Sequence, residues 1–439
     1  MKRLAYIILL IITVKISACN RGEVELLYDK PIDERIADTL KFIKSTLVGS
    51  EYGWIGYTST NSTGGYGFYI DFKENDRLLM VADILSTTAS EPKEATYRIR
   101  QIMAATLSFD TYSYITLLQD PNPGTIGGTA GKGLESDIEF EYKGIKADTI
   151  IFTGRRFKKY LKLVKATREQ KDRYLNGEYK TAIERINQFF ADNLNSYVEI
   201  DGRKYQISMD NSLKNSEATT LLEGNEVVSE RTIYYYDIDG VQFPEGLKVG
   251  NETLYYLRWE NNNLYALNRS GNKYLVQNSP QPLMALHILM GKKYTTLFSP
   301  HLTILGGTSS SGETILRRYH NGLASGAAGY IFNCGYVYLQ WNVVNQRIIV
   351  NGFSSQNGCS SGWTTTYTYS YELDSATGVY SLTKISGPTG GYVSAIMDQL
   401  INFLDNSSFR LDYHVEGTNV YGKIIGIDRS DVEMSFELL

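Results

Sequence analysis

The sequence predicts a mainly β protein with minor α content, arranged as two antiparallel β lobes with an N-terminal helix and a helical connector. Tyrosine (34 residues) and glycine (39) are abundant while proline (9) is scarce, which is typical of strands joined by tight turns. Apolar and polar residues alternate with a period of two in several stretches. Turn dipeptides such as Asp201-Gly202 and Asp239-Gly240 separate these stretches, as hairpins require. The lobes are expected to be curved sheets, partly open barrels or sandwiches.

The first residues resemble a bacterial export signal that ends at a cysteine. Lys2 and Arg3 precede an apolar stretch over residues 4–14, which is too short to span a bilayer as a helix. Small residues then lead to Cys19, and this order resembles the lipobox of bacterial lipoproteins, in which the cysteine thiol is acylated.

We therefore expect residues 1–18 to be a lipoprotein signal peptide, Cys19 to be the lipidation site, and residues 19–30 to be a tether. Lys15 departs from the usual pattern because it places a charge just before the cleavage region. The alternative is an ordinary signal peptide with an incidental cysteine.

Residues 31–166 are expected to form the N-terminal β lobe. Apolar residues at three- and four-residue steps predict an amphipathic helix over 32–48. The period then changes to two, and alternation over 66–72 with its return over 78–81 predicts a hairpin. Further elements are expected as a short helix within 109–118, a flexible glycine-rich loop over 121–133, and strands at 138–142, 149–152 and 160–164.

A charged amphipathic segment over 167–197, broken near Gly177, is expected to be the helical connector. Residues 198–439 are expected to form a C-terminal β-rich lobe. Its elements are expected as hairpins at 198–207, 233–243, 254–267, 330–353 and 364–382, a helix at 393–404, and strands at 409–415, 422–427 and 433–438. The stretches 108–164 and 393–439 share an order, a short helix followed by strands, which suggests two related β lobes.

Several motifs of the N-terminal lobe recur in a known family. They are Asp33-Glu34-Arg35, Gly53-Trp54, Gly64-Gly65-Tyr66 with Tyr69-Ile70-Asp71-Phe72, Leu107-Ser108-Phe109-Asp110-Thr111-Tyr112, Glu139-Phe140 and Ile150-Ile151-Phe152-Thr153-Gly154-Arg155-Arg156. Over residues 32–166 the chain resembles the domain of unknown function 4302 family of Bacteroidota lipoproteins. The family has no established catalytic residue to carry over. The resemblance implies an outer-membrane location near nutrient-uptake systems of the SusC/SusD kind, with the cell-surface and periplasmic faces both open.

The charge balance argues against some classes of partner. The formal net charge is only −4, and the lysines and arginines are scattered, so no basic stripe indicates nucleic acid. The chain has no second long apolar segment, so attachment to a membrane would depend on lipid at Cys19.

Cys334 and Cys359 remain as a pair if Cys19 carries lipid. In an exported protein such a pair can form a disulfide, here closing a loop of about 25 residues. Two buried free thiols are the alternative, and both states stay open at this point.

The sequence offers no convincing catalytic, metal or cofactor motif. The run 358–362 matches the G-x-S-x-G spelling of a hydrolase elbow, but a strand-like segment follows Ser360 where the elbow requires a helix. The stretch 307–314 has the glycine spacing of a phosphate loop, but Glu313 occupies the lysine position, and we interpret the stretch as a mobile loop. The four histidines are far apart and match no zinc motif. We therefore predict no catalytic residue, no metal ligand and no cofactor.

Clustered aromatic residues are the best candidates for ligand binding. Exposed rings offer a large, rigid contact area with a polar tip, and they can stack on sugar faces or clasp a peptide. The candidates are Trp259, Trp341, Trp363, Tyr367, Tyr369 and Tyr371. The alternative is that these rings fill the faces of sheets.

Together these features predict a lipid-anchored protein of the outer membrane. Its expected role is a non-catalytic binding or accessory component of a glycan or peptide uptake system, with SusC/SusD-like outer-membrane proteins as partners and no nucleic acid. A secreted hydrolase on a β scaffold and a structural envelope lipoprotein are the alternatives.

Overall fold

The computed structural model describes residues 31–110, 112–223 and 226–439. The signal peptide expected at 1–18, the lipidation site Cys19 and the tether expected at 19–30 lie outside the described residues. Strands dominate the described chain, so the fold class is mainly β, as the sequence predicts.

The chain divides into two compact units. The first contains the described residues up to Asn61 together with Phe68–Leu175, and the second contains Ser62–Gly67 and Asn176–Leu439.

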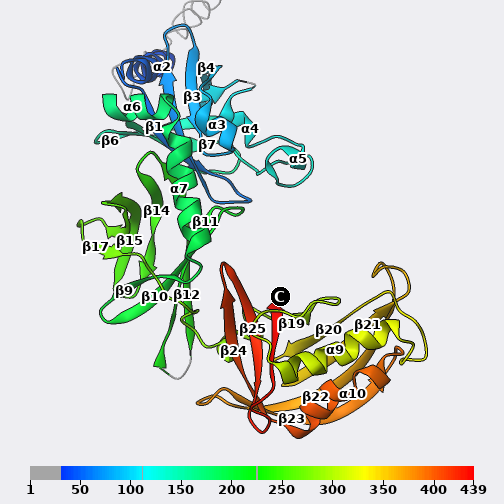
Figure 1. Ribbon diagram of the computed structural model, residues 1–439. Helices are drawn as coiled ribbons and strands as arrows, with labels where there is room; N and C mark the ends of the chain where they lie inside the picture. The colour runs from blue at the N-terminus through cyan, green and yellow to red at the C-terminus, as the bar shows by residue number, and fades with distance from the viewer. Residues whose placement is uncertain (1–30, 111, 224–225) are drawn as a thin grey trace, which may run out of the picture. The chain divides into compact units, whose positions relative to one another are not determined.

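An eight-stranded antiparallel sheet, most of whose residues belong to the first unit, closes into a barrel (Figure 1). The strands, in order around the barrel, are β1 (Trp54–Ser59), β2 (Gly65–Phe72), β3 (Arg77–Ala82), β4 (Lys93–Ile102), β5 (Ala104–Phe109), β6 (Glu139–Lys146), β7 (Thr149–Gly154) and β8 (Tyr160–Lys165). Pairing of β1 with β8, from Trp54 opposite Lys165 onward, closes the sheet. Because alternate residues of a strand point to opposite faces, one side chain in two fills the interior, among them Phe68, Phe109 and Phe140.

Helices accompany the first barrel. They are α2 (Ile32–Val48), α3 (Ser86–Ser90), α4 (Tyr114–Leu117), α5 (Pro123–Ile126) and α6 (Arg168–Leu175). The amphipathic helix predicted over 32–48 is confirmed: Pro31 precedes it, two acids occupy its first turn, and Leu47 is fully buried. It lies against β4 and β5, and the Trp54 indole donates a 2.8 Å hydrogen bond to the Leu47 carbonyl.

Two five-stranded antiparallel sheets follow in the second unit. The first has the order β12 (Val227–Ile233), β11 (Asn215–Leu221), β10 (Arg203–Asp210), β9 (Ser196–Ile200) and β18 (Gln277–Asn278). The second has the order β13 (Tyr235–Asp237), β14 (Gly240–Val249), β15 (Glu252–Glu260), β16 (Asn263–Asn268) and β17 (Lys273–Leu275). The sheets lie together, with β11 and β12 beside β14 and β9 beside β17.

The helix α7 (Glu178–Asp192) packs against β13 and β14. Gly177 precedes it with a φ of 90°, a left-handed conformation that ends the preceding helical segment. This is the break that the sequence predicts in the helical connector. No helix in the described ranges combines the length and the apolar composition needed to cross a membrane.

A second eight-stranded antiparallel barrel completes the second unit. Its strands are β19 (Thr296–Ser299), β20 (Cys334–Asn342), β21 (Arg347–Ser355), β22 (Trp363–Asp374), β23 (Val379–Thr389), β24 (Phe409–Glu416), β25 (Asn419–Gly426) and β26 (Glu433–Leu438). Pairing of β19 with β26 closes it. The region expected as one lobe, 198–439, therefore contains a pair of sheets and a closed barrel.

The helical elements of this part are α8 (Leu286–Leu289), α9 (Ser310–Ala324), η3 (Ser394–Ile396) and α10 (Asp398–Asn406). The prediction of a mobile loop over 307–314 is wrong, because α9 begins inside that stretch. The Ser309 side chain accepts a hydrogen bond from the Gly312 amide and caps the helix. Tyr319 and Leu323 then bury one helix face in the core of the barrel.

The two barrels share one topology. In each, eight antiparallel strands follow one another in chain order. A helix lies between the fifth and sixth strands of each, α4 in the first barrel and α10 in the second. The stretches 108–164 and 393–439, which share an order of helix and strands, occupy these corresponding positions.

One histidine is enclosed in the second barrel without a hydrogen-bond partner. His320 lies on α9 and is 2% exposed, and neither ring nitrogen has a partner in the described part of the chain. Burial, reinforced by the nearby His301 and Arg317, lowers the pKa of His320 to about 4. The imidazole is therefore neutral in the folded protein at neutral pH.

We expect acidification to destabilise the second barrel through His320. The pKa of the unfolded histidine is near 6.5, so stability is fully present above that pH and falls as the pH decreases toward 4. A pKa difference of this size corresponds to about 3 kcal/mol. Urea unfolding at several pH values should show wild type losing this stability relative to His320→Leu. A stability difference between the two proteins that does not change with pH would contradict the assignment.

Candidate functional site

The structure separates the six aromatic residues predicted to bind a ligand. Trp341, Tyr367, Tyr369 and Tyr371 are between 0% and 8% exposed in the core of the second barrel. The predicted binding surface is therefore wrong for these four residues, because closure of the barrel turns their side of β20 and β22 inward. Burial and a 2.8 Å hydrogen bond to Asp405 raise the pKa of the Tyr369 phenol.

Trp259, on β15, is half-buried under α7. The Arg185 guanidinium lies 3.9 Å from the centroid of its ring, and Phe189 makes an edge-to-face contact at 5.6 Å between centroids. Both residues belong to α7, so a helix already occupies the ring face that a ligand would need.

Trp363 lies open to solvent at the start of β22, with 44% of its surface exposed. The exposed Tyr392 ring lies 5.5 Å from Trp363, and it contacts the exposed Tyr330 at 4.9 Å, both measured between ring centroids. Phe332 is buried and contacts Tyr330 and Trp363 at 6.2 and 6.3 Å. We call the three exposed rings, Tyr330, Trp363 and Tyr392, the aromatic platform.

Three loops of the second barrel, each taken with the adjoining strand end, carry the platform: 326–334, 356–363 and 387–393. A disulfide between Cys334 and Cys359, with Cα atoms 5.4 Å apart, joins the first two loops. The Asn333 side chain also joins them, because it donates to the Gln356 carbonyl at 2.9 Å and accepts from the Gly358 amide at 3.0 Å. Of the two cysteine states that the sequence leaves open, the structure contains the disulfide.

The third loop is held against β22 by a close backbone approach. Thr365 accepts a 3.1 Å hydrogen bond from the Val393 amide. Gly391 has a φ of 59°, and a Cβ atom there would lie 2.2 Å from the Thr365 hydroxyl. Glycine at 391 therefore allows the loop to present Tyr392 beside Trp363.

The three loops contain no aspartate, glutamate, lysine, arginine or histidine. The polar side chains of these loops are uncharged amides and hydroxyls, such as those of Asn357 and Ser360, and both residues are exposed. Exposed rings bordered by neutral hydrogen-bonding groups can stack on an apolar face and bond hydroxyls at its edge. The sequence identifies Trp363 as a candidate but not Tyr330 or Tyr392, each of which directly follows a glycine.

The run 358–362 is a hairpin loop between β21 and β22, so no helix follows Ser360. The Ser360 hydroxyl donates to the Asn357 carbonyl at 2.6 Å, and no hydrogen bond joins it to a histidine in the described residues. The loop therefore lacks the geometry of a nucleophile elbow. Within the described ranges, no three His, Cys, Asp or Glu side chains lie close enough to hold a metal ion.

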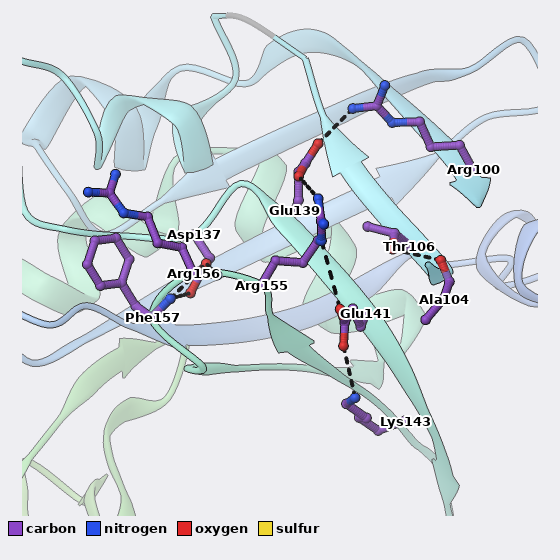
Figure 2. Close-up of polar contacts among 10 residues, drawn as sticks. All are labelled: Arg100, Ala104, Thr106, Asp137, Glu139, Glu141, Lys143, Arg155, Arg156 and Phe157. Atoms are coloured by element: carbon purple, nitrogen blue, oxygen red, sulfur yellow. Dashed lines mark hydrogen bonds and ion pairs between the residues drawn. The ribbon is translucent and has the colours of Figure 1, made fainter. Parts of the chain in front are cut away.

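A row of paired charges crosses the outer face of the first barrel (Figure 2). Glu139 on β6 accepts hydrogen bonds from Arg100 on β4 and from Arg155 after β7, each at 2.7 Å. Glu141, two residues further along β6, pairs with Lys143 at 3.1 Å. Because each carboxylate of the row is already paired with a basic side chain, we interpret the row as a structural link between strands. Exposed ion pairs of this kind contribute about 0–1 kcal/mol each to stability.

A buried carboxylate holds the turn after β7. Asp137 is 3% exposed and accepts hydrogen bonds from the backbone amides of Arg156 at 2.6 Å and Phe157 at 3.1 Å (Figure 2). A Cβ atom on Gly154 would lie 2.0 Å from the Asp137 carboxylate, so this approach requires glycine. The turn thereby places Arg155 where it can pair with Glu139.

Comparison with known proteins assigns the chain to a family. A sequence profile described as Domain of unknown function (DUF4302) matches residues 25–261, more than half of the chain. The chain belongs to this family. The DUF4302 match extends well beyond the motifs of residues 32–166 into the two five-stranded sheets, while the second barrel and its aromatic platform lie outside the matched residues.

No curated protein matches the chain. Among solved structures, similar chains include PCNA from Thermococcus kodakaraensis, with 8% identity over 59% of this chain and 97% of that chain and a TM-score of 0.10. Another is a mutant of the vaccine antigen Transferrin Binding Protein B from Haemophilus parasuis Hp5, with 8% identity over 87% of this chain and 73% of that chain and a TM-score of 0.13. At these TM-scores neither likeness supports an argument about fold or function.

We expect Asp137→Ala to destabilise the first barrel by about 1–3 kcal/mol, because two backbone amides of the turn lose the buried carboxylate that accepts their hydrogen bonds. Asp148→Ala removes an exposed aspartate from the turn between β6 and β7 and serves as the control. Urea unfolding of both variants measures the effect. Equal stabilities of the two variants would show that Asp137 does not hold the turn.

Proposed function

We propose that this protein is a lipid-anchored binding protein of the cell envelope that holds a neutral glycan on its aromatic platform. In this proposal it acts without catalysis, as an accessory component of an outer-membrane nutrient-uptake system. The observation that carries the proposal is the platform itself: Tyr392 contacts both Tyr330 and Trp363, and all three rings are exposed. A disulfide joins two of the three loops, and none of the three contains Asp, Glu, Lys, Arg or His.

The chemistry of the platform favours a glycan as its ligand. Sugar rings present an apolar face that stacks on tryptophan and tyrosine, and they present hydroxyls that bond neutral amides and hydroxyls. Because the buried Phe332 and the Cys334–Cys359 disulfide support the rings, little ordering is required on binding. A peptide ligand would instead gain from charged groups, and the three loops provide none.

The proposed location is supported by the N-terminal pattern of Lys2, Arg3, an apolar stretch and Cys19. A single acyl chain binds a membrane only marginally, so stable anchoring of a lipoprotein uses more than one chain. The proposed partners are SusC/SusD-like outer-membrane proteins of the uptake system.

The aromatic platform is tested by a glycan-binding screen on wild type, followed by affinity measurements on variants. We expect Trp363→Ala and Tyr392→Ala each to weaken binding of a captured glycan by about tenfold or more, since loss of a central aromatic contact costs about 1–2 kcal/mol or more. Tyr160→Ala, which removes an exposed tyrosine of the first barrel, should bind as wild type does. Undiminished binding by the Trp363→Ala, Tyr392→Ala double variant would refute the platform as the site.

The lipid anchor is tested by Cys19→Ala. Wild type should carry acyl chains on Cys19 in intact-mass analysis and should fractionate with membranes. The variant should lose both the added mass and the membrane association. Unchanged fractionation of the variant would refute anchoring through Cys19.

A further inference from the structure

We propose that the cavity between the two five-stranded sheets is a separate binding site for a small zwitterion, a short peptide with free termini and an apolar side chain. The cavity has a volume of about 430 Å³. Volumes of about 300–1,000 Å³ are typical of sites for small molecules. Both sheets line it, at the end where the β9–β10 and β14–β15 turns lie.

The inner face of the first sheet forms the floor of the cavity. Ala218 on β11 lies opposite Glu230 on β12, and Thr220 lies opposite Val228. Directly opposed residues project to the same face, so Glu230 and Val228 extend over the side that carries the buried Ala218 and Thr220. The buried ring of Tyr205 continues this floor.

The turn between β14 and β15 forms the facing wall. Gly250 has a φ of 60°, and a Cβ atom there would lie 2.5 Å from the Tyr205 hydroxyl. Glycine at 250 therefore lets the turn approach the tyrosine closely and narrows the cavity. Lys248 and Asn251 line the cavity from either side of this glycine.

Charged side chains of both signs surround the floor. They are Asp201, Arg203, Glu230 and Lys248. None of the four forms an ion pair or a side-chain hydrogen bond in the described part of the chain. By contrast, charged side chains on the outer face of the same strands do have partners. Arg231 forms an ion pair with Glu217 at 2.9 Å, and Lys204 lies 4.8 Å from the centroid of the Tyr197 ring.

This combination matches the chemistry of a peptide with free ends. Arg203 and Lys248 can bind a terminal carboxylate through charge-assisted hydrogen bonds. Asp201 and Glu230 can accept hydrogen bonds from a terminal ammonium group. An apolar side chain of the peptide then buries its surface on Val228 and the floor. This proposal is independent of the one made for the aromatic platform. It involves different residues, and its ligand carries charged termini whereas the glycan is uncharged.

The test is isothermal titration calorimetry of the purified full-length chain with the tripeptide alanyl-leucyl-alanine. We expect wild type to bind the peptide with free termini and not its N-acetylated, C-amidated form. Arg203→Gln and Glu230→Gln should each weaken binding on the order of tenfold, the effect of one charge-assisted hydrogen bond.

Matched controls lie one residue away on the outer face. Lys204→Gln and Arg231→Gln should bind the tripeptide as wild type does. The residues substituted in the two test variants and the two controls are all exposed, so all four variants should remain folded. No heat of binding at millimolar tripeptide, equal binding of the capped peptide, or an equal loss in the control variants would each overturn the proposal.

Discussion

Closure of the two eight-stranded sheets is the constraint on which the rest of the structure depends. Pairing of β1 with β8 and of β19 with β26 removes the free edges of each sheet and forces alternate residues into a closed interior. In the second barrel this interior accommodates Trp341, Tyr369 and Tyr380, whose rings pack with the aliphatic core. Closure therefore determines which aromatic residues pack in the core, and the exposed rings of the aromatic platform lie on loops outside it.

The loops that remain outside are ordered by specific contacts. In the second barrel, the Cys334–Cys359 disulfide and the Asn333 side chain join two loops, and Thr365 holds the third. In the first barrel, Asp137 holds the turn after β7. In both barrels, specific contacts to the backbone fix the loops that carry exposed side chains. In the first barrel these side chains are paired ions, and in the second they are the neutral rings of the aromatic platform.

Much of the fold could be predicted from the sequence, because period and turn residues are local properties. The helix over 32–48 follows from the spacing of its apolar residues, and the break at Gly177 follows from the glycine itself. The helix α9 was missed because its serine- and glycine-rich start resembles a loop. A period of two shows that Tyr367, Tyr369 and Tyr371 share a face, but only closure determines that this face turns inward. Likewise, Tyr392 contacts both Trp363 and Tyr330 through tertiary contacts that sequence spacing does not reveal.

Barrel closure buries one set of aromatic rings and leaves the aromatic platform exposed. Hydroxyl-radical footprinting of the native protein, read by mass spectrometry, measures this difference in exposure residue by residue. We expect rapid oxidation of Trp363, Tyr330 and Tyr392, together with protection of Trp341 and Tyr369 until the protein unfolds. Oxidation of Tyr369 as fast as that of Trp363 in the native protein would contradict it.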